Sequence, residues 1–542
     1  MTAATDLRLA APAATVWIVT AWGLGARAAG LLVAAATGVV LVGALAATCL
    51  ARSGLWRFLG PVVVCCGIAA TCALALALRI HVRDGHVLAS MPGKTTLTLT
   101  VRDDPRPIGP PAAGRVSLRV DVDAVGVRAT PPAAAEVIAA AASWSGLVPG
   151  QQVSTLARVG APRPGELLVA RLSATGPPTL RGRPPPWQRL AAHLRERLRR
   201  TAARALPADA AGLLPGLVLG DESTLDPDLA TAFRTAGLSH LTAVSGANFA
   251  LVCGAVILLV RVAGAPPGVV AGCGAVALVA FTILVRPSPS VLRAAMMGAI
   301  GLLALVTSRR SQALPALGAA VVVGILWWPE LARSPGFALS VAATAGLVLV
   351  APGIRDWLRR RRMPRGLADL VALAIAAQVM TAPVLAFVGG TLSVASVVAN
   401  IVVAPVVGFI GVAGLLAALV GAIGGDGGVG TTVAEFGIRA LGPEVWWMIA
   451  CARWFGAHQT TVLEVPDGLP GAVLVIGVLL VVGGLVRVRT VGGIWHDGRC
   501  DRTAASAPRR QRLLDRPCRR RGGGAAVGGL RSGGPGHPGP RR

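Results

Sequence analysis

Long apolar runs, separated by short loops that carry arginine, occupy most of this chain. The N-terminal part holds three such runs, at residues 9–26, 28–50 and 58–80. A run of about 20 apolar residues is long enough to cross a lipid bilayer as a helix. The pattern therefore predicts a polytopic α-helical membrane protein. Three crossings from a cytoplasmic N-terminus leave most of the flanking arginines inside, so residue 81 is expected to lie outside the cytoplasm.

Residues 81–186 follow a different pattern. Between residues 116 and 123 apolar and polar side chains alternate with a period of two, which predicts a half-buried strand. Apolar positions at 97–101 and at 167–172 predict two more strands, and Pro/Gly-rich joints separate the three. About 100 residues of short strands suit a small OB-like β-barrel. The segment contains no cysteine, so we expect an inserted extracytoplasmic barrel without disulfides.

A third pattern covers residues 187–206, where one helical face is apolar and arginines surround the rest. The apolar face carries Trp187, Leu190, Leu194 and Leu198. This arrangement predicts a basic amphipathic helix that lies in the membrane surface. We favour lipid phosphate as the partner of its arginines, with nucleic acid as the alternative.

Apolar runs return beyond residue 206 and predict a multi-helix membrane domain over 207–486. They lie near 242–260, 267–285, 290–307, 313–328, 334–352, 366–388, 392–422 and 469–486. The run 392–422 is too long for one simple crossing and contains Pro405, so we expect a broken or re-entrant helix there. Residues 433–455 are expected to span the membrane or to lie at its interface.

The composition agrees with a membrane protein, since 54% of the 542 residues are hydrophobic and 14% are charged. The net charge of +27 is explained mostly by arginines in loops and in residues 487–542, so it says little about a substrate. These last residues are rich in Arg, Gly and Pro. Such a composition cannot bury a core, and the tail is expected to be disordered.

Asparagine is rare in this chain, and both of its asparagines lie within long apolar runs, at Asn248 and Asn400. Asparagine, lysine and tyrosine have A/T-rich codons, and the chain has one lysine and no tyrosine. We therefore expect a GC-rich bacterial genome, in which an asparagine retained at membrane depth is a functional candidate. For either residue alone, a hydrogen bond between packed helices is an equal alternative. Taken together, the two favour function.

A polar stretch before the run at 242–260 contains Gly220-Asp221 and Gly237-Leu-Ser-His-Leu-Thr-Ala-Val-Ser-Gly246. Three further blocks follow in order, at 289–294, at 334–340, and at 378–383 together with 393–405. In this order the blocks resemble the signature of the ComEC/Rec2 competence family, the DNA-uptake channel proteins of bacterial inner membranes. The resemblance covers roughly residues 10–486.

The resemblance implies an external OB-like domain, a multi-helix channel domain and often a C-terminal metallo-β-lactamase-like domain. That last domain needs a His-x-His-x-Asp-His cluster, which none of the seven histidines of this chain forms. We therefore expect no nuclease activity and no metal or other cofactor in this polypeptide. The implied partners are a single DNA strand in transit, the lipid bilayer, an external DNA receptor, cytoplasmic motor or nuclease proteins, and further copies of the chain in a homo-oligomer.

A polyanion in a membrane needs a hydrated path lined by donors or cations, because each bare phosphate is costly to desolvate. The candidate lining or motif residues are Asp221, His240, Ser245, Asn248, Arg293, Ser340, Gln378 and Asn400. Arg293 either lines the path or snorkels to the lipid headgroups. Asp221 is expected to cap the following helix, with pairing to an arginine as the alternative. His240 is expected to be a hydrogen-bonded histidine at a helix end and not a catalytic base.

Three functions are compatible with the sequence. The preferred one is a multi-pass channel component of the plasma membrane for uptake of single-stranded DNA during natural transformation. The second is transport of another anionic polymer or solute on the same scaffold. The third is an inactive truncated product. The tail bears on this choice, since it is either a basic arm or the result of a reading-frame change. We favour the frame change, because the family normally continues with structured sequence.

Overall fold

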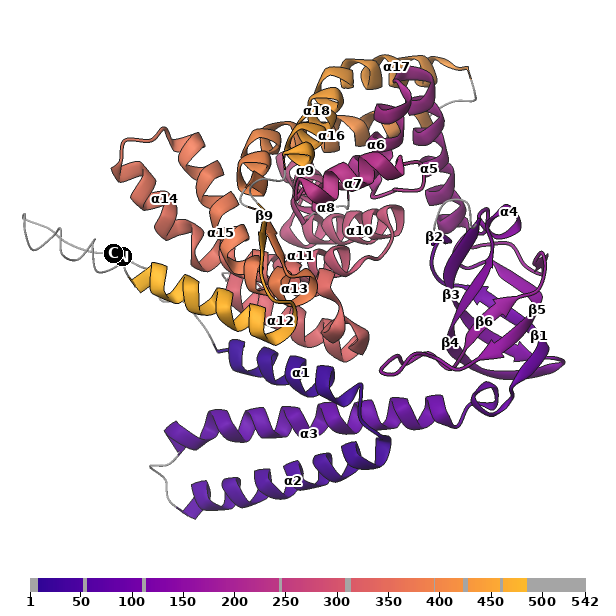
Figure 1. Ribbon diagram of the computed structural model, residues 1–542, viewed down its shortest axis with the longest axis vertical. Coiled ribbons are helices and arrows are strands. Elements are labelled where there is room, and N and C mark those ends of the chain that lie inside the picture. Colours follow the sequence, from indigo (N-terminus) through magenta and orange to yellow (C-terminus); the bar gives the residue numbers. More distant parts are fainter. Residues whose placement is uncertain are drawn as a thin grey trace, which may run out of the picture. The chain divides into compact units, whose positions relative to one another are not determined.

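The computed structural model describes residues 8–51, 56–109, 114–242, 246–307, 313–393, 395–422, 427–458 and 462–484. The tail predicted over 487–542 and the candidate Ser245 lie outside these residues. The chain divides into two units, residues 1–476 and 477–542. An apolar helix, Gly468–Gly484, continues from the first unit into the second, and the other helices and strands in Figure 1 belong to the first.

Six helices of the described residues are long and apolar enough to cross a membrane. They are α2 (Ala28–Ala51), α3 (Trp56–Asp84), α10 (Pro267–Val285), α11 (Pro289–Val306), α15 (Arg365–Gly389) and α16 (Ala395–Ala422). A seventh is obtained if α13 (Pro335–Leu349) and α14 (Ala351–Arg360), which are bent by 43°, form one span. The prediction of a polytopic helical membrane protein is confirmed.

The first of the three predicted N-terminal crossings forms a short helix. α1 (Ala10–Gly23) has 14 residues, fewer than the roughly 20 of a straight crossing. Its Trp17 ring lies 5.3 Å from that of Phe337, and Trp17 Nε1 donates a hydrogen bond to the Ala332 carbonyl at 2.9 Å. α2 and α3 have the required length and lie side by side (Figure 1). The side of the membrane that residue 81 faces stays a prediction.

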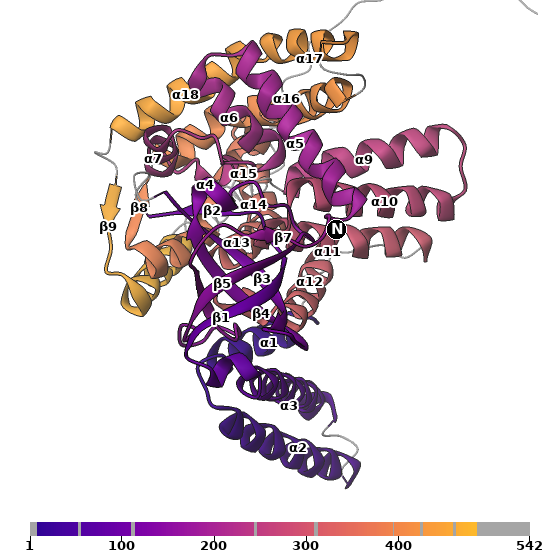
Figure 2. The same cartoon turned by 90° about the vertical axis from the view of Figure 1, so that its right-hand side faces the viewer.

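The segment after α3 forms a closed five-stranded barrel (Figure 2). Its strands are β1 (Gly93–Val101), β3 (Arg115–Val125), β4 (Arg128–Ala140), β5 (Gln152–Gly160) and β6 (Arg171–Ala174). Their order is β1-β3-β4-β6-β5, and β5 pairs with β1 to close the ring. All pairs are antiparallel except β4 with β6. Short strands β2 (Arg106–Ile108) and β7 (Thr179–Leu180) pair with β3 and β5. The predicted small inserted barrel is confirmed.

The alternation read from the sequence is present in β1 and β3, whose apolar side chains fill the barrel core. The strand predicted over 167–172 is displaced, because the paired residues of β6 begin at Arg171. β4 and β5 are not among the predicted strands. In β4 the buried positions are largely alanines, which give little contrast with their neighbours. Trp144 of α4 (Ala141–Trp144) is fully buried and donates to the Gly176 carbonyl at 3.0 Å.

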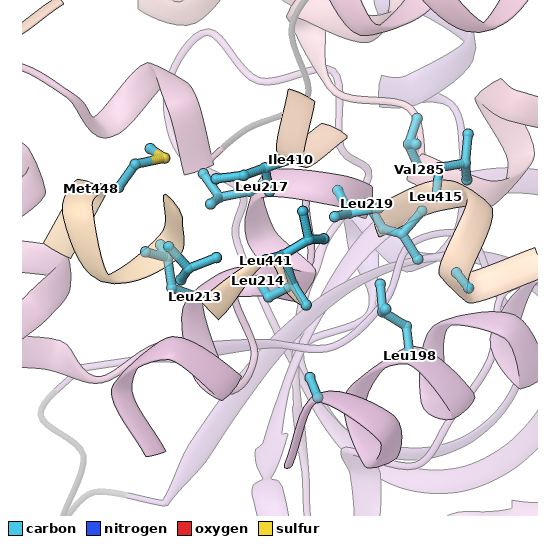
Figure 3. Close-up of a cluster of buried hydrophobic side chains, with 14 of the residues drawn as sticks. Leu198, Leu213, Leu214, Leu217, Leu219, Val285, Ile410, Leu415, Leu441 and Met448 are labelled. Atoms are coloured by element: carbon cyan, nitrogen blue, oxygen red, sulfur yellow. The ribbon is translucent and has the colours of Figure 1, made fainter. Parts of the chain in front are cut away.

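The predicted amphipathic helix is α5 (Pro186–Ala205), which begins the helical domain, α5 to α18 (Pro186–Ala457). Part of its apolar face is covered by protein. Figure 3 shows Leu198 among side chains of α6 (Ala208–Leu219), α16 and α18 (Gly442–Ala457). Trp187 and Leu190, near its start, are exposed. The expectation that arginine only surrounds the apolar face is wrong for Arg195, which is buried because carboxylates and carbonyls surround it.

The helices from α9 onward largely follow the predicted apolar runs, whereas α6, α7 and α8 precede the first of these runs. After α6 come α7 (Pro227–Thr235), α8 (Ser239–Thr242) and α9 (Gly246–Val262), and α12 (Ala313–Trp327) and the 3-10 turn η3 (Pro329–Arg333) stand between α11 and α13. α9, α10 and α11 lie side by side (Figure 2). A two-stranded sheet of β8 (Thr391–Ser393) and β9 (Val462–Glu464) joins the start of α16 to the chain after α18.

The broken or re-entrant helix predicted within the run 392–422 is wrong for Ala395–Ala422. α16 is one continuous helix of 28 residues that includes Pro405. Neighbouring helices pack on it, and such packing lets a buried membrane helix tolerate the N–H that proline lacks. The sharp bend lies instead between α13 and α14. Residues 433–455 fall into α17 (Val429–Ala440) and α18, and neither is long enough for a straight crossing.

Candidate functional site

Gly220 and Asp221 stand where α6 ends and the chain turns towards α7. Gly220 has φ 67°, a left-handed conformation that favours glycine at the end of a helix. The turn places the Asp221 side chain, which is 6% exposed, against α5. The Ser223 hydroxyl donates to Asp221 Oδ1 at 2.7 Å. The prediction that Asp221 caps α7 is wrong, because Asp226 is the capping residue.

Asp221 is one of two carboxylates beside the buried guanidinium of Arg195. Arg195 Nη2 lies 3.4 Å from Asp221 Oδ2 and 3.7 Å from Asp104 Oδ2. Its Nη1 donates to the carbonyls of Leu219 and Leu284, at the ends of α6 and α10, at 3.3 and 3.2 Å. Helix C-termini carry partial negative charge, so they favour a cation at this position. Arg195 therefore joins a barrel loop to the ends of two helices.

A second arginine connects the same barrel loop to the turn between α10 and α11. Arg286 Nε donates to Asp104 Oδ2 at 2.8 Å, and its Nη1 donates to Gln188 Oε1 on α5. The backbone of Arg286 has φ 70°. Asp104, Arg195, Asp221 and Arg286 thus form one cluster between the barrel and the helical domain, which we call the arginine junction.

Ion pairs at the arginine junction offset the cost of burial. Burial raises the pKa of Asp221, but Arg195, the hydrogen bonds from Ser223 and the nearby Arg199 outweigh it and hold that pKa below its ordinary value. Burial lowers the pKa of Arg195, while the two aspartates oppose this shift. An arginine stays protonated in proteins at neutral pH. The junction therefore keeps its ionic form.

Another buried arginine lies deeper in the helical domain. Arg293 on α11 is 8% exposed, which disagrees with a side chain that snorkels to the headgroups. Its Nε donates to Ser340 Oγ on α13 at 2.7 Å, and its Nη1 donates to Met297 Sδ at 3.3 Å. Ser340 Oγ lies 3.2 Å from Ser290 Oγ. No carboxylate of the described residues pairs with Arg293, so neutral groups surround its charge.

Asn248 on α9 is buried and faces α16. A Cβ atom at Gly411 of α16 would lie 3.4 Å from Asn248 Oδ1. The described side chains, among them Val218 and Phe281, leave a cavity of about 10 Å³ beside it, the room of roughly one water molecule.

Asn400 lies at a different level of α16 from the part that faces Asn248. Asn400 precedes Gly411 on α16 by eleven residues, about 16 Å along the helix axis. Its Nδ2 donates to the Ser396 carbonyl of its own helix at 2.8 Å. Gln378 on α15 is half-buried. His240 on α8 has a lowered pKa, because burial of its ring among protein atoms outweighs a hydrogen bond with the Gly237 backbone.

The four sequence blocks contact one another in the fold. A Cβ atom at Gly237, which has φ 72°, would collide with the side chain of Ser396 at the start of α16. A Cβ atom at Gly246 would lie 3.2 Å from Arg293 Nη2. Arg293 binds Ser340, and α13 packs on α15. The blocks therefore form one continuous region of the helical domain.

Three members of the arginine junction are missing from the residues that the sequence singles out. Asp104 stands in a Pro-rich joint of the barrel, Arg195 is one of several arginines on α5, and Arg286 is a lone arginine between two apolar runs. Of the three, only Arg286 could have been singled out from the sequence. A single charged residue in a short turn between two apolar runs has few local partners, so it is expected to pair with a distant group. Within the described ranges, no group of three or more His, Cys, Asp or Glu residues is placed to hold a metal ion.

Comparison with known proteins bears on the same region. Residues 217–490 match the model of the competence protein family, just over half of the chain. The ComE operon protein 3 of Bacillus subtilis (strain 168) is 26% identical over 200 residues, which cover 36% of this chain and 24% of that protein. No solved structure matches the chain. The family match spans the four blocks that contact one another, and the chain belongs to the competence protein family.

Proposed function

We propose that this protein is a channel component of the bacterial cell membrane that carries a single DNA strand inward during natural transformation. The family match and the relative from the ComE operon support a role in competence. The observation that carries the channel proposal is Arg293, a buried cation without a carboxylate partner among the described residues of a membrane domain. A site of this kind favours an anion, because it replaces hydration that the anion loses.

The chemistry of the Arg293 site suits a phosphate backbone. Guanidinium and hydroxyl groups donate to phosphate oxygens whatever the base, so Arg293, Ser290 and Ser340 would bind every nucleotide alike. Asn248 on α9, which lies beside Gly411 of α16, and Asn400 on α16 would offer donors to other phosphates of the same strand. In this proposal α9 and α16 move apart when a strand passes, because the cavity beside Asn248 holds about 10 Å³.

The surrounding parts have matching roles in this proposal. The barrel would lie on the outer face and receive DNA from an external receptor. A cytoplasmic motor and a nuclease would be separate proteins, and copies of the chain would assemble as a homo-oligomer in the bilayer. No catalytic step is assigned to this chain.

The test uses a transformable bacterium whose own competence channel gene is deleted. Expression of this chain should restore a nuclease-protected pool of labelled donor DNA inside the cells, and the Arg293→Met variant should not. The second variant, Arg261→Gln, removes an exposed arginine at the end of α9 and should restore uptake like the parent chain. Failure of the parent chain, when it is inserted at a normal level, would refute the proposal.

The second candidate function is transport of another anionic polymer or solute. It is favoured by the same observation, because nothing at Arg293 reads a base. Uptake of labelled inorganic polyphosphate by the same cells, without uptake of DNA, would establish it.

A further inference from the structure

We propose that Arg195 and Arg286 of the arginine junction form a binding site for a DNA phosphodiester, and that the carboxylate of Asp104 occupies this site while DNA is absent. The identity of the ligand rests on the proposed function, whereas the site itself rests on the geometry. The site is separate from Arg293 and lies where the barrel meets the helical domain.

The two arginines converge on a single oxygen. Arg286 Nε lies 2.8 Å and Arg195 Nη2 lies 3.7 Å from Asp104 Oδ2. Arginine side chains bind the oxygens of phosphates with the same charge-assisted hydrogen bonds that they make to carboxylates. A phosphodiester and a carboxylate each carry one negative charge, so the exchange of one for the other leaves the local charge unchanged.

The two aspartates of the arginine junction differ in how firmly they are held. The Asp221 side chain is 6% exposed and receives hydrogen bonds from the hydroxyl and the backbone N–H of Ser223. The Asp104 side chain is 31% exposed and stands on a loop of the barrel. Asp221 is therefore the permanent partner of Arg195, and Asp104 is the group that a ligand can replace.

Two further observations point to a ligand at Asp104. Its loop joins the first two strands of the barrel ring, β1 and β3, and in OB barrels this loop belongs to the surface that binds oligonucleotides. Arg286 holds φ 70° and ψ 145°, a conformation that only glycine adopts without strain. Strained residues of this kind cluster at binding sites, where surrounding contacts keep a side chain aimed at its target.

The test measures binding of fluorescent oligothymidylate to the full-length protein in detergent, by polarisation. Asp104→Asn removes the competing charge and should lower the Kd about tenfold. Arg286→Gln should raise the Kd about tenfold and reduce the magnitude of the salt-dependence slope by about 0.7, the loss of one phosphate contact. The double variant should behave like Arg286→Gln, because Asp104 acts only through the site.

Asp103→Asn is the matched control, since it removes the same charge one residue earlier from a carboxylate that forms no ion pair within the described part of the chain. It should leave the Kd within about twofold of the parent value. An oligomer with an uncharged backbone should show no response to Asp104→Asn. All variants are compared at equal folded fraction, measured by circular dichroism.

Unchanged or weaker oligothymidylate binding by Asp104→Asn would overturn the inference, because a purely structural contact predicts one of these results. Equal gains for Asp104→Asn and Asp103→Asn would also overturn it, since they would indicate a general charge effect. If Asp104→Asn increases only the retention of phosphatidylglycerol in mixed micelles, the site binds lipid phosphate and the assignment to DNA is wrong. None of these measurements depends on transport, so they stand apart from the uptake test.

Discussion

Arg293 Nε and Ser340 Oγ form a hydrogen bond of 2.7 Å that joins two helices whose contacting residues are 47 positions apart in the chain. The bond leaves the charge of Arg293 without a carboxylate partner among the described residues. In a soluble protein a buried cation of this kind would destabilise the fold, because its loss of hydration is not offset by a counter-charge. In a membrane protein of the competence family it is the feature that the proposed channel needs, because a passing phosphate can supply the missing charge.

Arg293→Met should reduce DNA uptake about 10- to 100-fold, because charge-assisted hydrogen bonds to a phosphate are lost at a buried point of the proposed path. Arg293→Lys keeps the charge but not the planar fork, and should restore part of the uptake. The measurement is nuclease-protected label per cell, normalised to the amount of inserted protein. Full uptake by Arg293→Met would show that this arginine only packs.

Asn248→Leu and Asn400→Leu should each block transport, because they keep the branching of the side chain but replace its amide donors with methyl groups. Membrane levels should stay near normal, since one hydrogen bond between membrane helices contributes only about 0.6 kcal/mol. Thr282→Val is the matched control, because the Thr282 hydroxyl binds the Leu278 carbonyl of its own helix. If both asparagine variants insert at the parent level and import DNA, the lining assignment fails.

Asp221→Asn should lower the melting temperature in detergent, with a loss of about 3 kcal/mol, because it leaves Arg195 buried with one counter-charge fewer. The pKa of Asp221 is lowered in the folded protein, so its contribution is complete above the ordinary value of 3.8 and is lost as pH falls through the lower folded value. The gap between the parent and the variant should therefore close only in strong acid. Asp226→Asn should change the melting temperature little, because asparagine also caps a helix.

A gap that closes near neutral pH would instead mean that another group controls the stability of the arginine junction. Lack of any gap at neutral pH would mean that the ion pair between Arg195 and Asp221 contributes nothing net, as happens when desolvation cancels attraction.

The barrel should lie outside the cytoplasm, and single cysteines can test this topology. The sequence predicts that Gly165 lies in an exposed loop. It is nevertheless a poor site for a cysteine, because a Cβ atom there would collide with the Arg333 side chain. Val127, in the turn between β3 and β4, is fully exposed. Val127→Cys should react with an impermeant thiol reagent in intact cells, and Arg360→Cys at the C-terminal end of α14 should react only after lysis. The opposite labelling pattern would show that the barrel lies in the cytoplasm.

The class of the protein could be predicted from the sequence because the relevant signals are local. The length of an apolar run decides whether a helix can cross a bilayer, and period-two alternation at 97–101 and 116–123 identifies strands whatever surrounds them. The order of four short blocks was sufficient to indicate the family. Alanine-rich β4 escaped prediction because its local pattern has little contrast.

Only the tertiary structure decided which polar groups meet. Asp104 and Arg286 are separated by 182 residues, and Arg195 becomes buried because distant elements supply its partners. No local sequence pattern indicates such a pairing. The sequence therefore predicted that Asp221 caps a helix, whereas the fold places it beside α5. The same reason explains α16, which stays continuous because packing against its neighbours offsets the hydrogen bond that Pro405 cannot make. Periodicity determined where most helices and strands lie, and long-range contacts determined which charged side chains pair with one another.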